Sequence, residues 1–564
     1  MNKGVLSRRG FLKATCGVAL GPRLGHSASG GAAAKKPNII FFLVDDYDKL
    51  ETSVYGGNVL TPNLDRLAKE GITFHNAHMT STVCTPSRYT CLTGRYAGSS
   101  YSRRYLAECP AGMQGLPAFN VELEDDNMNV GAILAKNGYA TGYVGKYHVG
   151  PEIDKDNSER YGLHYIPKNC EFSEKVNRQK RENERRHRQL IKERGFTWAK
   201  NIYWTNLKVP FKGHNPEWTI WAALEFIEEH KDEPFYLHYC TTLLHGPNGE
   251  WFKSLSKPLV TGEGILDEPL TDPGKRESVM ERLRKTGLGE NEAGYLWNDD
   301  SVGMILDKLD ELGIADNTIF VFIADHGSVF KGSLYKDRGT EVPCIMRWPS
   351  GMKKNVQCHE LIQNTDFVPT WFELAGADVP KGYRMDGVSI APLFSRPERS
   401  VRDCVYGEMG PARSVKTKDY DYIALRYTSD QIEAIRAGDN RGIKKLQGLS
   451  GGVSRGRAKP GAFSYDQLYD LRRDPLEQRN LAGERRYQGK LREMKALLKR
   501  QLRRFEGRPF GEFIPGGNAV PGGGYDDALE KMAKAGNPKG SKPTKAQREP
   551  GKRRRQEQYP SNHR

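Results

Sequence analysis

The stretch Asn38-Ile39-Ile40-Phe41-Phe42-Leu43-Val44 is followed at once by Asp45-Asp46. An unbroken apolar run rich in β-branched and aromatic residues is typical of a strand buried on both faces. Such strands lie inside parallel sheets that helices cover. The stretch therefore predicts an α/β fold with carboxylates at the end of a buried strand.

Three further apolar runs end in the same way, with charged or imidazole side chains. Run 139–144 leads to Lys146 and His148, run 235–244 to His245, and run 319–324 to Asp325 and His326. Helical patterns lie between them, at 62–70, 218–230 and 301–312. Because ligands bind beyond the carboxyl ends of parallel strands, these side chains are expected to form one site. The predicted fold class is α/β, with a large mostly parallel sheet flanked by helices.

The length of the chain indicates more than one domain. Its 564 residues are too many for one ordinary domain, and 37% hydrophobic residues suffice for a substantial core. We predict a catalytic domain over 35–395. Shorter strand-like pieces and a helix near 487–505 predict a smaller C-terminal α+β domain over 396–506, interrupted by a Gly-rich loop at 450–460.

The first 34 residues carry Ser7-Arg8-Arg9-Gly10-Phe11-Leu12-Lys13 and a short apolar run. This segment resembles a twin-arginine export signal, which implies the twin-arginine export machinery as a partner. The run is too short to span a bilayer, and we expect no transmembrane helix in the mature chain. The prediction is a periplasmic or secreted bacterial protein. Nine cysteines in 564 residues are too sparse for a disulfide scaffold. None of them shows the C-x-x-C spacing of a zinc site.

The tail over 507–564 is rich in Gly and Pro and strongly basic. From Lys531 onward it holds eleven Lys or Arg against two Glu, out of a net charge of +16 for the chain. We predict that the tail is disordered. It is either a plain solvated extension or a segment attracted to a polyanion such as a sulfated polysaccharide. No nucleic-acid recognition motif accompanies the charge, so we expect no nucleic-acid partner.

The pentapeptide Cys84-Thr85-Pro86-Ser87-Arg88 predicts a short helix, with Thr85 as N-cap and Gly94 beyond its end. Cys84 would then lie at a helix N-terminus, which favours an anion. Arg88 returns to the same helix face and can point towards residue 84. The alternative is a buried structural cysteine before a capped helix.

This pentapeptide resembles the C-x-P-x-R signature of the formylglycine-dependent sulfatases, of the alkaline-phosphatase-like superfamily. Supporting stretches are T-P-N-L-D-R-L-A at Thr61, G-Y-V-G-K-Y-H at Gly142, A-D-H-G at Ala324 and L-Y-D-L-R-R-D-P at Leu468. The resemblance extends from Pro37 to about Phe505. It implies that a maturation enzyme oxidises Cys84 to formylglycine, and that the hydrated aldehyde is the nucleophile.

The resemblance also implies a metal site. Clustered carboxylates beside an anionic substrate repel each other unless a hard cation bridges them, and oxygen-rich ligation suits Ca²⁺ or Mg²⁺. The family usually uses Ca²⁺. The implied ligands are Asp45, Asp46, Asp325, His326 and residue 84.

The remaining site residues have implied roles in sulfate transfer. Lys146 and Lys331 would neutralise the transferring group, and Lys336 is a second candidate because the sequence around Lys331 departs from the family pattern. His245 would protonate the leaving alcohol, and His148 would take the proton of the second geminal hydroxyl when sulfate leaves. The loops at 109–120, 174–205 and 251–275 are predicted to set substrate specificity.

The predicted activity is removal of sulfate from a sulfated carbohydrate or another organic sulfate. A phosphate or phosphonate monoester hydrolase with the same nucleophile is the nearest alternative. A two-zinc phosphatase is less favoured, because the extra His and Asp ligands expected for a second metal are not evident in the sequence. A sulfated-glycan-binding protein with a degenerate site is the alternative from a different class.

Overall fold

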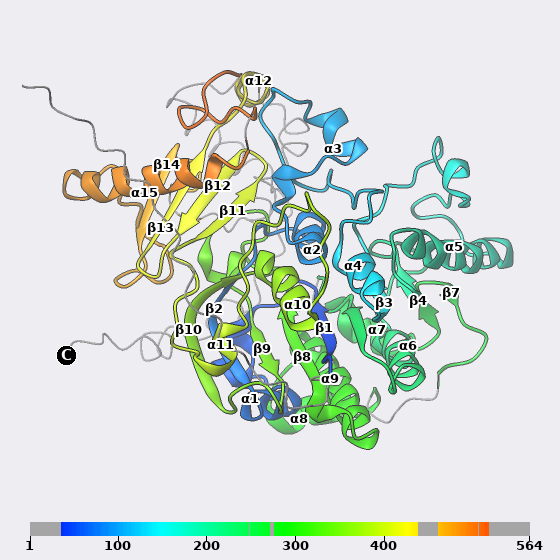
Figure 1. Ribbon diagram of the computed structural model, residues 1–564. Coiled ribbons are helices and arrows are strands. Elements are labelled where there is room, and N and C mark those ends of the chain that lie inside the picture. Colours follow the sequence, from blue (N-terminus) through cyan, green and yellow to red (C-terminus); the bar gives the residue numbers. More distant parts are fainter. Residues whose placement is uncertain are drawn as a thin grey trace, which may run out of the picture. The chain divides into compact units, whose positions relative to one another are not determined.

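The computed structural model describes residues 35–246, 249–270, 276–437, 459, 461–505 and 507–517. Its centre is an eight-stranded sheet of order β10-β2-β9-β8-β1-β5-β3-β4 (Figure 1). The strands are β1 Asn38–Val44, β2 Ile72–His78, β3 Ala140–Lys146, β4 Trp198–Tyr203, β5 Phe235–Cys240, β8 Thr318–Ala324, β9 Cys344–Arg347 and β10 Val356–Gln363. Only β9 runs antiparallel to its neighbours, which are β8 and β2. The prediction of a mostly parallel sheet is therefore confirmed.

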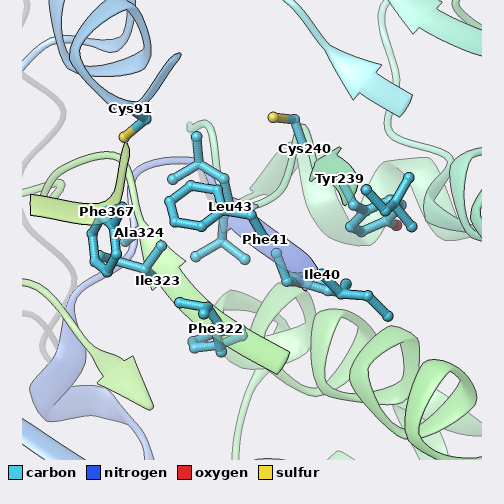
Figure 2. Packing of buried hydrophobic residues seen from close by; sticks show 14 of the residues in the cluster. Ile40, Phe41, Leu43, Cys91, Tyr239, Cys240, Phe322, Ile323, Ala324 and Phe367 are labelled. Carbon is cyan, nitrogen blue, oxygen red and sulfur yellow. The ribbon is translucent and has the colours of Figure 1, made fainter. Parts of the chain in front are cut away.

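Strand β1 lies between β5 and β8 and is parallel to both. Its seven residues are all buried, as its unbroken apolar sequence requires. Successive side chains face opposite sides of the sheet. Phe41 packs edge-on against Phe367, with ring centroids 5.2 Å apart, whereas Phe42 packs on Tyr239 and Phe322. Figure 2 shows this packing around Phe41.

Helices cover both faces of the sheet. Helix α9 packs against α1, α6 and α8, and α10 packs against α2 and α4. The helices of this part of the chain are α1 Pro62–Lys69, α2 Cys84–Thr93, α3 Arg103–Glu108, α4 Val130–Lys136, α5 Glu174–Glu193, α6 Pro216–Glu229, α7 Gly249–Leu255, α8 Ser278–Thr286, α9 Ala293–Glu311, α10 Phe367–Ala375 and α11 Pro392–Ser395. The predicted helical pattern at 301–312 is the second half of α9.

A second, antiparallel sheet follows in the chain, with strand order β11-β12-β13-β14. Its strands are β11 Val405–Met409, β12 Ala412–Lys416, β13 Tyr420–Leu425 and β14 Asp466–Asp470, with helices α12 Ser429–Arg436 and α15 Gln488–Leu502. α15 packs on β12 and β13 through Leu491, Met494 and Leu498. This agrees with the predicted smaller α+β part. The domain boundary near 395 stays a prediction.

The start of the tail differs from the prediction. Phe510 and Phe513 are buried in the same cluster as α15, and Arg426 pairs with Glu512. Residues 507–517 therefore belong to the folded structure. The prediction failed here because the overall Gly- and Pro-rich composition of the tail outweighed the two aromatic side chains that anchor its first residues. Residues 518–564, the export signal at 1–34 and most of the Gly-rich loop at 450–460 lie outside the described residues. Within the described ranges, no helix is both long enough and apolar enough to cross a membrane.

Candidate active site

Helix α2 places Cys84 at the edge of the large sheet. The helix begins at Cys84 itself and ends at Thr93, and Gly94, with a φ of 65°, is its left-handed C-cap. The prediction that Thr85 caps the helix is wrong: the N-cap residue is Val83, and its side chain makes no capping bond. Pro86 is tolerated in the first turn because its missing N–H would have no partner there. Cys84 thus lies in that first turn, where unpaired N–H groups favour an anion.

The predicted strand-end residues do come together. Asp45 follows β1, Asp325 and His326 follow β8, and Lys146 ends β3. The amide of Asp325 donates to the carbonyl of Val44 at 2.9 Å, which holds the two strand ends side by side. Since the strands are parallel, all four side chains emerge at the same edge of the sheet.

Charged groups surround the thiol of Cys84. Its Sγ lies 3.4 Å from Asp45 Oδ1 and 3.4 Å from His326 Nε2. The ammonium groups of Lys146 and Lys331 lie 3.5 Å and 3.6 Å from the same sulfur. Burial and Asp45 act to raise the pKa of the thiol, but Lys146, Lys331 and His326 outweigh them and lower it. The position therefore favours a negatively charged group.

Arg88 is fully buried and holds the carboxylate of Asp325. Its Nε donates to Asp325 Oδ2 at 3.1 Å, and its Nη1 donates to the carbonyl of Lys146 at 3.2 Å. The guanidinium therefore ties the end of β3 to the end of β8. The sequence predicted only that Arg88 could point towards residue 84; the structure shows that it also binds Asp325 and the carbonyl of Lys146.

The carboxylates of the site titrate differently. Burial acts to raise the pKa of Asp45, but Lys146 and Arg88 hold it well below its usual range. Asp46 is likewise held at a pKa of about 2, against burial, by Lys331 and His326. Burial raises the pKa of Asp325 to about 7. The site thus concentrates opposite charges in a buried space, where Coulomb interactions are strong.

Four of the predicted metal ligands form one cluster. Asp45, Cys84, Asp325 and His326 each offer a ligand atom, and these atoms lie within 4.8 Å of one another. Asp46 is adjacent, with its Oδ1 3.4 Å from His326 Nε2. Two carboxylates, an imidazole and residue 84 make a donor set that fits a divalent cation.

The structure separates the two candidate lysines. Lys331 Nζ lies 2.7 Å from Asp46 Oδ1, inside the site. Lys336 Nζ instead lies 3.4 Å from Glu341 Oε1. Of the two, Lys331 is therefore the lysine that lies beside Cys84.

The two predicted proton-transfer histidines lie on loops that follow β3 and β5. His148 has a φ of 53°, and its amide donates to the carbonyl of Trp204 at 3.1 Å. Its Nδ1 is buried and finds no hydrogen-bond partner among the residues that the structure describes. His245 Nε2 lies 3.0 Å from Asn206 Nδ2. Burial lowers the pKa of both, that of His245 to about 3, so both imidazoles are neutral.

Two residues near the site had no sequence prediction. Asn206 contacts His245, and no motif marks it. Glu477 is fully buried and accepts the backbone N–H groups of Lys336 at 2.9 Å and Asp337 at 3.2 Å, in the loop that follows Lys331. It lies just beyond the L-Y-D-L-R-R-D-P stretch that carried the family resemblance, so a longer motif would have included it.

Comparisons with known proteins identify the family of the chain. The sulfatase family model matches residues 37–377, and the C-terminal model of N-sulphoglucosamine sulphohydrolase matches 324–437. An ulvan-active sulfatase of Formosa agariphila is 27% identical over 466 residues, covering 80% of this chain and 77% of the relative. An N-acetylgalactosamine-6-O-sulfatase of Bacteroides thetaiotaomicron is 26% identical, covering 83% and 93%.

Solved structures share the fold. One protein in complex with its substrate D-glucosamine-2-N,6-O-disulfate has a TM-score of 0.55 at 19% identity, over 85% of this chain and 100% of that one. A protein from a study of glycosaminoglycan metabolism by Bacteroides thetaiotaomicron has a TM-score of 0.57 at 22% identity, over 83% and 99%. With the family model matching more than half of its length, this chain belongs to the sulfatase family and is a sulfuric ester hydrolase.

Proposed function

We propose that this sulfatase removes sulfate from a sulfated carbohydrate, with Cys84 converted to formylglycine and one divalent cation, Ca²⁺ or Mg²⁺, in the site. The observation that carries the proposal is the surroundings of Cys84, whose sulfur lies within 3.6 Å of Asp45, Lys146, His326 and Lys331. The names of the relatives, which act on ulvan and on N-acetylgalactosamine sulfate, support a carbohydrate substrate.

Formylglycine, once hydrated, would supply one hydroxyl to attack sulfur and a second whose deprotonation releases sulfate. Asp45, Asp46, Asp325 and His326 would hold the cation, which would offset their negative charge and polarise the sulfate. Arg88 keeps the Asp325 carboxylate in place for this purpose.

Lys146 and Lys331 approach residue 84 from different elements, the end of β3 and the loop after β8. A sulfate group placed against residue 84 would therefore meet an ammonium group from each. Fixed cations aimed at a transferring anionic group stabilise the charge that develops in the transition state. They need no reorganisation, because their ion pairs with Asp45 and Asp46 already fix them.

His245 is proposed as the acid for the leaving alcohol and His148 as the base that takes the proton at residue 84. The neutral His148, whose buried Nδ1 has no hydrogen-bond partner among the described residues, suits a base. His245 is also neutral, and an anionic ester bound beside it would raise its pKa, because opposite charge favours the protonated form. Asn206 would orient its ring.

We also propose that the chain is exported by the twin-arginine machinery to the periplasm or beyond the cell, and that a formylglycine-generating enzyme matures it. The residues Ser7-Arg8-Arg9-Gly10-Phe11-Leu12-Lys13 support export. The pentapeptide from Cys84 to Arg88 supports maturation.

The comparisons give no support to the phosphate hydrolase or to a non-catalytic glycan-binding protein. A direct test is a panel of sulfated glycans and matched phosphate monoesters, with Cys84→Ala as control. Peptide mass spectrometry should verify that residue 84 is formylglycine in the sample. The proposal is supported if the matured protein releases sulfate and Cys84→Ala does not. A preference for the phosphate ester would reject it.

A further inference from the structure

Two loops belong to the segment around the edge strand β4: 204–212 follows β4, and 163–173 precedes α5, which leads into β4. The first loop, 204–212, follows β4 directly. The carbonyl of its Trp204 accepts the amide of His148 at 3.1 Å, and its Asn206 lies 3.0 Å from His245 Nε2. This loop therefore runs past both proton-transfer histidines before it reaches Lys208.

The second loop, 163–173, packs on the first. The rings of Phe172 and Phe211 meet edge to face, with centroids 6.3 Å apart. This contact brings Lys168, on the second loop, towards Lys208, on the first. The two lysines thus come from segments distant in sequence but adjacent in the fold.

The charge of these two loops is unbalanced. Burial lowers the pKa of Lys208, and so does the positive charge of Lys168, Lys212 and Lys146, which are near enough to act on it. Among the described residues, neither Lys168 nor Lys208 forms an ion pair with a carboxylate. Like charges held together cost free energy, which a bound anion would recover.

Apolar side chains stand exposed beside these lysines. Tyr165 and Phe172 of the second loop are 42% and 44% exposed, and Val209 of the first is 53% exposed. Large apolar side chains left in water next to a cleft commonly mark a binding surface. An aromatic face can cover the C–H face of a sugar ring.

We propose that Lys168 and Lys208, with the exposed rings of Tyr165 and Phe172, form a subsite for a second anionic group, a sulfate or carboxylate, on the sugar next to the one that loses sulfate. The inference rests on the proposed function, and it narrows the substrate to a polyanionic oligosaccharide. The lysines would bind the second anion, and the rings would support the sugar that carries it.

The test uses a matched pair of substrates for the matured enzyme. One is a sulfated disaccharide whose second sugar is a uronate, and the other is its carboxyl-reduced, neutral form. An aryl sulfate reports on the chemistry alone. Lys168→Ala/Lys208→Ala should lower kcat/KM for the uronate form by about three- to tenfold, the range expected for two partly exposed ion pairs. It should leave the reduced form and the aryl sulfate within about twofold.

Lys231→Ala, at the surface just beyond the C-terminal end of α6, is the control and should change none of the three values. The pair Lys168→Arg/Lys208→Arg should keep the preference for the uronate form, because the charge is retained. Equal losses on both disaccharides, or no loss on either, would overturn the subsite. Failure of the parent enzyme on the aryl sulfate as well would instead count against the proposed function. In that event, Cys84→Ala still tests the subsite by calorimetric binding of the two disaccharides, and equal affinities would reject it.

Discussion

Glu477→Gln should release the loop that carries Lys331. Glu477 is fully buried, accepts the amides of Lys336 and Asp337, and pairs with Lys459 Nζ at 3.0 Å. Glutamine keeps the shape of the side chain but leaves the Lys459 ammonium buried without its counter-charge. Removing one partner of a buried ion pair costs about 3–5 kcal/mol. At about 1.4 kcal/mol per factor of ten, opening of the loop should become about 100-fold to several thousand-fold more frequent.

Amide hydrogen exchange at Lys336 and Asp337, read by mass spectrometry, measures this opening directly, and urea unfolding measures the global cost. Glu493→Gln is the matched control, because Glu493 pairs with Lys490 at the surface of α15 with its side chain 64% exposed. That change should cost less than about 1 kcal/mol.

The double variant Glu477→Gln/Lys459→Met should recover part of the loss, since no unpaired charge remains buried. Turnover should fall in Glu477→Gln and return in part in the double variant. Unchanged exchange at Lys336 and Asp337 in Glu477→Gln would refute the assigned role of Glu477.

Four further outcomes are expected. Cys84→Ala should abolish turnover without changing the fold; fully active protein whose residue 84 is a plain thiol by mass spectrometry would contradict this. Asp45→Asn should lose the divalent ion and the activity together, because it removes a metal ligand without changing the side-chain volume. Metal analysis that finds no bound ion in the active protein would contradict the proposed metal site. His245→Ala should slow a sugar sulfate at least about tenfold more than an aryl sulfate with an acidic phenol, whereas His148→Ala should slow both alike. Burial acts to raise the pKa of Glu341, but Lys336 and Lys49 outweigh it and lower the pKa to about 2. Ionised Glu341 therefore stabilises the fold above about pH 4.5, and this stabilisation is lost as the pH falls towards 2. Glu341→Gln should reduce the stability measured at about pH 6 and leave it little changed at about pH 2.

The sequence was most informative where burial dictated composition. The run 38–44 coincides with β1, because a strand covered on both faces admits only apolar side chains. Parallel pairing then brings Asp45, Lys146 and Asp325 to one edge, so the site followed from the strand ends.

Other features depended on contacts that sequence patterns do not encode. The antiparallel β9 is four residues long and has no periodicity to set its direction. Thr85 is a good N-cap by residue type, yet the helix starts at Cys84, because residues far away in sequence fix the first turn. The choice between Lys331 and Lys336 depended on loop geometry, and Asn206 lies in a loop without a motif.

The burial of helix α2 limits when Cys84 can be modified. All ten of its residues are buried, and Cys84 is 1% exposed. An enzyme that oxidises this thiol needs the segment around it free to enter its own cleft, which in the folded chain would require extracting a helix from the core. If Cys84 is matured as proposed, its oxidation would therefore have to occur before this part of the chain folds. Under the same proposal, a molecule that folded with its thiol unoxidised would keep that thiol, so the active fraction of a preparation would be set before folding is complete.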